Sequence, residues 1–349
     1  MTPDEKHIKR INKYLLSING IYDELIREIV LLVIQLRVAD KMFRFKDYQR
    51  ITKQVDEAFK TYRTNLNNSV KVYSEYEWDF ANKKIDGIIT DKLNAVKSKI
   101  PLDTYENKLR ELAKQSQNKS AFEAFQTRKK GKFTTSERVW NIAGQARENI
   151  ELAIDVALKE GMSAQELARR IKGNLNNPDA LFRKVRDKHG NLVLSQNAKT
   201  FHPGQGVYRS AHKNALRMAS NEINMAYRES EQIRISKNPD VVGVEIHLSP
   251  QHSVRDLCDD LAGRYPKDFQ WSAWHPQCKC HRRTVLKSDE EFISELNQGL
   301  ELPPESSKNF VKSPPKEFDK WVSDNADKME NWKRKPSFLT ENKKFVKSS

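Results

Sequence analysis

The chain of 349 residues contains only three cysteines and twelve glycines. So few cysteines, in an odd number, exclude a disulfide-rich secreted scaffold. The glycines form neither a Walker loop nor a dinucleotide fingerprint, so neither motif predicts nucleotide binding. The longest apolar run, Ile29 to Ile34, is far shorter than the ~20 residues of a membrane-spanning helix. Because residues Met1 to Lys6 also lack the pattern of a signal peptide, we expect a cytoplasmic chain with no membrane span.

Apolar residues are also scarce, at 37% of the chain, whereas charged residues make up 31% and the mean hydropathy is −0.79. This balance favours long solvated helices over a thick hydrophobic core. The length exceeds what one core usually serves, so we expect two or more domains. The formal charge of +15 and the pI near 9.5 attract polyanions, which are most often nucleic acids or acidic proteins.

Apolar residues at alternating steps of three and four predict two long helices in the first part of the chain. One series runs from Ile8 to Phe43 and includes Ala39, and the other runs from Ile51 to Phe80. The simplest interpretation is an antiparallel helical pair. The first series carries extra apolar residues at Val30, Leu31, Val33 and Ile34. These residues face either other parts of the same fold or a partner protein.

Residues 118–133 are polar and predict a linker, with a domain boundary near 130. Helices are expected after Thr134 and after Ser163, because each begins a capping-box pattern. Turn-forming residues between two apolar runs predict a hairpin at 182–194, followed by a helix over 210–236. The branched residues of 241–248 and 283–286 predict two strands.

The predicted fold class is therefore mainly α, with a long N-terminal helical hairpin or bundle, a helical middle, a small α/β subdomain that contains the cysteines and histidines, and an extended C-terminal tail. The expected segments are a helical arm (1–130), a helical body with the hairpin (131–237), a small α/β Cys/His domain (238–288) and the tail (289–349).

All three cysteines lie close together in the sequence, as Cys258, Cys278 and Cys280, and His275 precedes the second of them by three residues. Three thiolates and one imidazole are a donor set that zinc prefers. The residues predict a structural metal site, with zinc as the cofactor. Two alternatives remain open, namely metal-free packing of small buried cysteines and a catalytic metal. Asp256 could supply an oxygen ligand or a contact to a ligand.

The sequence around these residues resembles the C-terminal signature of the Mu F-like minor head proteins of tailed bacteriophages. In that family, a His or Cys three residues before Leu-x-Gly is followed by His-Pro-x-Cys-x-Cys, and Cys258 to Gly263 and His275 to Cys280 are similar to this pattern. Residues 217–226 resemble the family's helix with an Arg-Thr-Glu motif, with Glu222 at the glutamate position and Asn221 at the threonine position. The resemblance covers about 134–286.

The resemblance implies a phage or prophage minor capsid protein that docks on the portal and assists head assembly and the handling of packaged DNA. The implied partners are the portal protein, a scaffold or major capsid protein, and DNA bound without sequence specificity. The implied location is the virion, in the capsid interior near the portal vertex, after assembly in the host cytoplasm. The basic segments 169–172, 183–188 and 333–335 could contact DNA phosphates or could be ordinary solvated surface.

An enzyme is the main rival hypothesis, either a nuclease or a toxin-like hydrolase that acts on nucleic acid. A zinc deaminase needs His-x-Glu and Pro-Cys-x-x-Cys, and the chain has neither spacing. A cysteine nucleophile would need a histidine partner, for which His275 and His281 are the nearest candidates in sequence. The scattered histidines form no spacing that predicts a nuclease. We therefore assign no catalytic residues and expect a protein that is not an enzyme.

Overall fold

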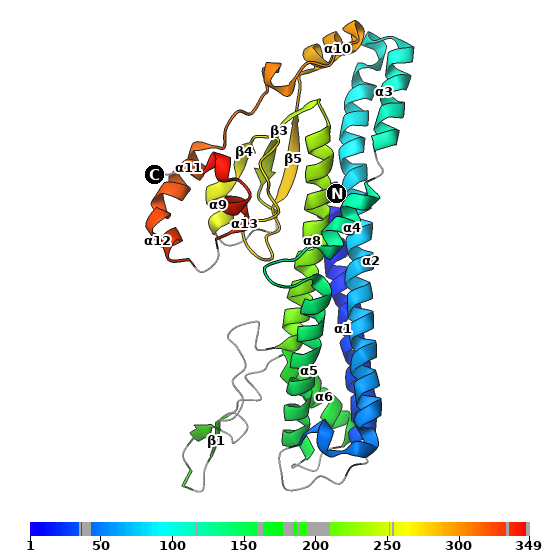
Figure 1. Cartoon of the computed structure of the whole chain (residues 1–349), viewed down its shortest axis with the longest axis vertical. Helices are drawn as coiled ribbons and strands as arrows, with labels where there is room; N and C mark the ends of the chain where they lie inside the picture. The colour runs from blue at the N-terminus through cyan, green and yellow to red at the C-terminus, as the bar shows by residue number, and fades with distance from the viewer. Residues whose placement is uncertain are drawn as a thin grey trace. The chain divides into compact units, whose positions relative to one another are not determined.

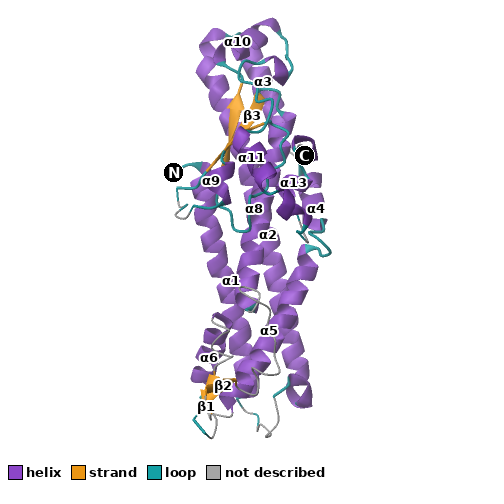
Figure 2. Ribbon diagram, turned by 90° about the vertical axis from the view of Figure 1, so that its left-hand side faces the viewer, coloured by secondary structure: helices purple, strands orange, loops and turns teal. Residues whose placement is uncertain are grey.

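The structure, a computed structural model, describes residues 1–34, 36, 43–115, 118–158, 163–176, 184–186, 189–190, 192–194, 210–250, 252, 255–332 and 335–346. Within these ranges the chain is mainly α-helical, with one three-stranded sheet and one strand pair, which confirms the predicted fold class (Figures 1 and 2). In the same ranges, no helix is both long enough and apolar enough to cross a membrane.

The helices are α1 (Pro3–Val33), α2 (Gln49–Val96), α3 (Leu102–Gln115), α4 (Lys119–Thr127), α5 (Thr135–Leu158), α6 (Ala164–Asn176), α8 (Ala211–Lys237), α9 (Leu257–Leu261), α10 (Asp289–Gln298), α11 (Lys316–Asp324), α12 (Ala326–Glu330) and α13 (Ser337–Thr340). The strands are β1 (Lys184–Arg186), β2 (Leu192–Leu194), β3 (Val241–His247), β4 (Gly263–Tyr265) and β5 (His281–Leu286). Short 3-10 turns lie at Phe45–Asp47, Lys97–Lys99, Pro304–Ser306 and Lys343–Phe345.

The chain divides into two compact units, each assembled from separated segments. Unit 1 comprises Met1–Lys9, Ser74–Phe125 and Ile223–Ser349, and unit 2 comprises Arg10–Tyr73 and Gln126–Glu222. The long helices α1, α2 and α8 each contribute residues to both units. The four consecutive segments expected from the sequence therefore do not coincide with the compact units. Each unit combines residues that are distant along the chain.

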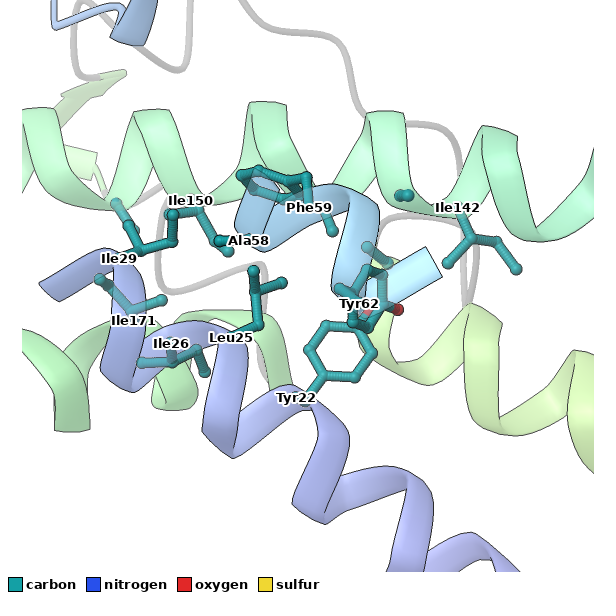
Figure 3. Close-up of a cluster of buried hydrophobic side chains, with 14 of the residues drawn as sticks. Tyr22, Leu25, Ile26, Ile29, Ala58, Phe59, Tyr62, Ile142, Ile150 and Ile171 are labelled. Atoms are coloured by element: carbon teal, nitrogen blue, oxygen red, sulfur yellow. The ribbon is translucent and has the colours of Figure 1, made fainter. Parts of the chain in front are cut away.

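The core of unit 2 forms where α1 and α2 pack against each other. The ring of Tyr14 stacks on Tyr73 at 4.0 Å, and Tyr22 meets Tyr62 edge-on at 4.9 Å. Later residues of α1 thus face earlier residues of α2, which confirms the predicted antiparallel pair. Figure 3 shows the cluster around Tyr22 and Tyr62, to which α5 and α6 add aliphatic side chains. These are Ile142, Ile150 and Ile171.

The prediction that the first helix extends to Phe43 is wrong, because α1 ends at Val33. Phe43 is nevertheless 1% exposed, and its ring packs edge-on against Phe45 with centroids 5.3 Å apart. Its backbone N–H donates to Asp155 Oδ1 on α5 at 2.8 Å. The apolar spacing therefore predicted the burial of Phe43 but not its secondary structure. Phe43 lies outside α1, just before the 3-10 turn Phe45–Asp47. Ala39, the seam position before it, lies outside the described residues.

The second helix is longer than predicted, because α2 runs for 48 residues to Val96. From Ile85 onward, apolar residues recur at steps of three or four, and these residues are buried in the cores of unit 1. They are Ile85, Ile89, Leu93 and Val96. The same periodicity thus builds the core of unit 2 at one end of the helix and the cores of unit 1 at the other.

The linker predicted over 118–133 is wrong for most of its length, because Lys119–Thr127 forms α4. Phe122 and Phe125 stand three residues apart, which places them on one face of this short helix. Both rings pack within 5.5 Å of the Trp78 ring, measured between centroids. Two buried aromatic residues therefore hold this helix against the rest of unit 1, although its other residues are exposed or partly exposed.

Unit 1 contains a three-stranded antiparallel sheet in the order β4-β3-β5 (Figure 1). Val244 of β3 pairs with Tyr265 of β4 on one side and with Thr284 of β5 on the other. The strands predicted at 241–248 and 283–286 are thus confirmed as β3 and β5. In unit 2, β1 pairs with β2 antiparallel within the predicted hairpin, of which residues 182, 183, 187, 188 and 191 lie outside the described part.

The C-terminal segment is extended between short helices and adds buried aromatic residues to unit 1. Phe318 of α11 is 0% exposed and lies against Tyr265 of β4 and Phe269 of the segment that follows β4. Phe338 of α13 is 1% exposed and meets the Trp274 ring at 5.1 Å. This aromatic packing covers the segment in which the cysteines lie.

Candidate metal centre

Cys258 is positioned by the start of the short helix α9. The side chain of Asp256 accepts a hydrogen bond from the Cys258 backbone N–H at 2.7 Å, and Asp259 accepts one from the Asp256 N–H at 2.8 Å. This reciprocal capping box fixes the first turn of the helix. As a result, Cys258 faces inward and is 1% exposed.

The His-Pro-Gln-Cys segment forms a tight turn that places the other cysteines. The Cys278 N–H donates to the His275 carbonyl at 3.2 Å, which closes the turn. Pro276 stands at its second position and Gln277 at its third, with a φ of 64°. Proline followed by a positive φ is typical of a type II turn. Cys280 then directly precedes β5, so both cysteines are held between a turn and a strand.

The structure brings the three cysteines together as free thiols. Their sulfur atoms all lie within 4.8 Å of one another, and the Cys258 and Cys278 sulfurs are 3.7 Å apart. Zn–S bonds of about 2.3 Å in a tetrahedron would separate two sulfurs by ~3.8 Å. All three side chains are at most 3% exposed. The spacing is therefore compatible with metal ligands, and the predicted grouping of these three cysteines is confirmed.

His275, the predicted fourth ligand, lies beside this cluster but is not among the donors that all lie within 4.8 Å of one another. Its Nδ1 is 2.8 Å from the Pro276 carbonyl oxygen, which only accepts hydrogen bonds, so Nδ1 carries the proton. Nε2 lies 3.1 Å from Cys258 Sγ and 3.2 Å from the Asp256 carboxylate. A metal-binding histidine is oriented in this way, with one ring nitrogen bound to a carbonyl and the other facing the metal.

The three thiols shift one another's pKa values. Hydrogen bonds from Cys258 and Cys280 lower the pKa of the Cys278 thiol, with a contribution from the Arg228 charge. Hydrogen bonding to Cys278 and then Cys280 raises the pKa of Cys258. Cys258 lowers the pKa of Cys280, but Cys278 and burial outweigh it and raise that pKa to about 12. A metal ion that binds all three sulfurs must displace the remaining thiol protons.

Helix α8 holds the backbone of the cysteine segment through two residues that sequence reasoning missed. Arg228 donates to the carbonyls of Ser272, Cys278 and Cys280 at 2.6, 2.8 and 2.6 Å. Asn224 donates to the Cys278 carbonyl at 3.0 Å. Their spacing of four residues puts both on one helix face. This spacing is the one sequence feature that could have linked the two residues to each other. These donors fix the carbonyls that flank the sulfur ligands.

A second group of possible ligands adjoins the first and shares Cys258. His252, Asp256 and Cys258 have donor atoms within 4.8 Å of one another. The Asp256 carboxylate also lies 3.2 Å from His275 Nε2. His252 is engaged by Asp259 at 2.8 Å, and this hydrogen bond raises the pKa of the imidazole. The carboxylate of Asp256 is therefore the alternative fourth donor to His275.

Glu222, which the resemblance singles out, makes structural contacts in unit 2. Arg138 binds its Oε1 at 2.8 Å, while Arg128 and Thr135 bind its Oε2 at 3.0 Å. Burial would raise the pKa of this carboxyl, but Arg128 and Arg138 outweigh burial and lower it. Glu222 thus ties α8 to the start of α5 as a carboxylate.

No protein-family model, no curated protein sequence and no solved structure matches the chain.

Proposed function

We propose that the chain is a minor head protein of a tailed phage or prophage, with a structural zinc ion in its Cys/His domain and a portal-binding surface on unit 2. The observation that supports this best is the buried group of Cys258, Cys278 and Cys280, since three of the residues that carry the resemblance lie close together as possible metal ligands. The basic charge of +15 suits a protein that is enclosed with DNA.

Zinc would be held by the three cysteine sulfurs and by His275 Nε2. Four protein ligands leave no coordination position for a substrate, so the ion would stabilise the fold and would not catalyse a reaction. Arg228 and Asn224 fix the carbonyls beside two of the sulfurs and so limit their movement when the metal is absent.

Elemental analysis of the purified full chain tests this site and should give about one zinc per chain. Cys258→Ser should abolish binding, and His275→Gln should weaken it at least tenfold, a change of about 1.4 kcal/mol in binding free energy. His252→Gln serves as the matched control and should leave the stoichiometry unchanged. If His252→Gln and not His275→Gln releases the metal, the ligand set is wrong. A folded wild-type chain without metal would exclude the site.

Attachment to a portal would use an apolar groove between α1 and α6 in unit 2. The groove has a volume of about 460 Å³, and its floor includes Ile26 and Val30. Both are buried, at 4% and 3% exposed, whereas Leu31 on the wall is 61% exposed. Of the extra apolar residues in this helix, Val30 and Val33 thus belong to the core, and Leu31 remains available to a partner.

The occupant that fits this groove is a portal segment with apolar side chains flanked by carboxylates. Arg27 and Arg169 line the groove as cations, while Lys172 is paired with Asp23 at 2.7 Å. The groove therefore combines an apolar floor with a positive edge. Such a surface favours an acidic amphipathic segment.

Co-purification of the full chain with the portal protein from the same genome tests the attachment. Leu31→Asp should reduce recovery of the complex at least tenfold, because it places a carboxylate on the apolar wall. Leu16→Asp is the matched control, since Leu16 is 68% exposed on the same helix and does not line the groove. The full chain is required, because a chain begun near Thr134 would remove parts of both units. No recovery with the wild-type chain would count against the head-protein proposal.

The rival enzyme hypothesis is tested on the same preparation. Cleavage of DNA or RNA by the full chain, lost in a variant with an intact fold, would replace the proposal with a nucleic-acid-cleaving function. Absence of cleavage, together with DNA affinity that falls steeply with salt, would agree with binding alone.

A further inference from the structure

Unit 2 has a second hollow, between α2 and α5, whose composition differs from that of the groove described above. Its volume is about 330 Å³, and it is lined by aromatic, cationic and very small residues. Trp140 of α5 is 62% exposed there, although its neighbour Val139 is 2% exposed. Packing within unit 2 therefore does not account for the tryptophan.

Two small residues keep the indole of Trp140 uncovered. Ala143 and Gly144 follow it at three and four positions, so they share its face of the helix. A helical side chain leans back over the preceding turn, so a side chain at position 144 would extend toward residue 140. A Cβ on Gly144 would have no heavy atom within 4 Å. The notch beside the indole is open space.

Cations from α2 and α5 surround this notch. Lys60 and Arg63 line it from α2, and Arg147 lines it from α5. Asp56 binds Arg147 at 2.6 Å, and the guanidinium packs over the Phe59 ring at 5.6 Å. Three cationic residues and one carboxylate line the hollow; Arg147 engages that carboxylate, and Lys60 pairs at 3.1 Å with Glu57, which lies outside the lining. The lining residues carry a net positive charge beside the exposed indole, and an exposed pair such as Lys60–Glu57 is weak enough for a phosphate to compete with Glu57.

We propose that this hollow binds single-stranded nucleic acid, with a base stacked on Trp140 and the adjoining phosphates on Lys60 and Arg63. An aromatic face beside cations is the combination that unpaired strands use, because every base offers a π-face and every linkage a negative charge. A duplex keeps its bases stacked inside, so only its phosphates would engage. An acidic peptide would use the cations but has no need of the open indole. The site goes beyond the proposed function and depends neither on the metal nor on a portal.

Fluorescence anisotropy with a labelled thymidine oligonucleotide of about 16 nucleotides tests the proposal. Trp140→Ala should raise the Kd for the single strand roughly tenfold, since one stacked base contributes about 1–3 kcal/mol. Trp140→Phe should keep most of the affinity, because a ring remains. The Kd for a duplex of the same length should stay nearly unchanged in both variants.

Gly144→Leu provides a second variant that alters neither charge nor aromatic content. It fills the notch and should stabilise the helix by about 1 kcal/mol, so loss of binding could not be attributed to unfolding. We expect it to weaken single-strand binding at least as much as Trp140→Ala. Arg63→Glu should weaken binding more than Lys53→Glu, a charge reversal on the same helix outside the hollow.

Equal single-strand affinities of the wild type, Trp140→Ala and Gly144→Leu would overturn the proposal. An equal loss of affinity for the single strand and the duplex would also overturn it, because such a loss would show that binding depends on charge and not on base stacking. Binding of a polyglutamate peptide that depends on Trp140, in a chain that does not bind the oligonucleotide, would assign the hollow to an acidic protein partner instead.

Discussion

At the scale of single residues, Gln277 shows how the cysteine turn is built under strain. Its φ of 64° lies in the left-handed region, which costs a residue with a side chain about 1–2 kcal/mol. The turn that presents His275 and Cys278 requires this conformation. The strain is thus located where the donor atoms are brought together, as often occurs at functional sites.

We expect Gln277→Gly to stabilise the chain by about 1 kcal/mol, because glycine adopts a positive φ without steric conflict. Thermal unfolding of the two proteins measures the difference. Lys279→Gly is the control in the same segment, and it should destabilise the chain because its φ is not positive. Equal effects of the two glycines would show that the turn conformation is not strained.

Glu222 illustrates how a buried carboxylate responds to pH. Its pKa is lowered from 4.5, so between the two pKa values the unfolded chain binds more protons than the folded one. Its contribution to stability is therefore present above about pH 4.5 and is lost as the pH falls through the lowered folded pKa. Thr135, Arg128 and Arg138 lose a charged partner when it protonates.

Glu222→Gln should lower the free energy of unfolding by about 3 kcal/mol at pH 7, because two partly buried arginines lose their counter-charge. Urea denaturation at pH 7 and pH 3 measures this difference, which should shrink at the lower pH. Glu148→Gln, an exposed position on α5, should change stability by less than about 0.5 kcal/mol. A loss that is the same at both pH values would mean that the carboxylate charge contributes nothing.

At the scale of elements, the C-terminal segment is joined to the central strand of the sheet. A register irregularity in β3 lies between Val241 and Gly243, and the Val242 carbonyl accepts a hydrogen bond from the Val311 N–H at 3.1 Å. A Cβ at position 243 would lie 2.4 Å from Val311 Cγ2. Glycine is therefore needed at 243 because another segment crosses the strand there.

Gly243→Ala should destabilise unit 1 by about 1–3 kcal/mol through overpacking. Adding Val311→Gly should restore part of the loss, and a double-mutant cycle on the melting temperature gives the coupling energy. Gly87→Ala in α2 is the control, since no heavy atom lies within 4 Å of its Cβ position, and it should be neutral or stabilising. Additive effects of the substitutions at 243 and 311 would show that the two positions do not touch.

At the scale of the whole molecule, the discontinuous units determine how far a local change spreads. Unit 1 includes residues Met1–Lys9 together with the cysteine segment. His7 lies 3.0 Å from Asn224 Oδ1, and Asn224 Nδ2 donates to the Cys278 carbonyl. A change at the metal centre should therefore reach the first residues of the chain.

Under the zinc proposal, treatment with a chelator should raise amide hydrogen exchange over 257–286 and, to a smaller extent, over 1–9. Exchange in α5 of unit 2 should change little, because a separate core protects it. Mass spectrometry of peptic fragments measures all three regions. Equal loss of protection in α5 would show that the two units unfold together.

Local sequence patterns determined the longest helices, two strands of the sheet and the proximity of the cysteines. Apolar spacing placed α1, α2 and α5, because one periodic face is enough to define a helix. The closeness of the cysteines in the sequence predicted their closeness in space. Cys278 closes the turn, and Cys280 follows two residues later, just before β5. The resemblance to a head-protein family came from the same few residues and stays a prediction, as do zinc, the portal and the virion.

Only the tertiary structure decided the contacts between residues that are far apart in the sequence. The burial of α4 depends on Trp78, and the bonds from Arg228 to the cysteine carbonyls join segments about 50 residues apart. The hollow beside Trp140 forms between two helices that are distant in the sequence, and Lys60 and Arg63 line it from α2. Periodicity reports which face of an element is apolar, but it carries no information on which distant segment covers that face. Packing between distant segments therefore determined which residues form each compact unit and which residues line the groove and the hollow.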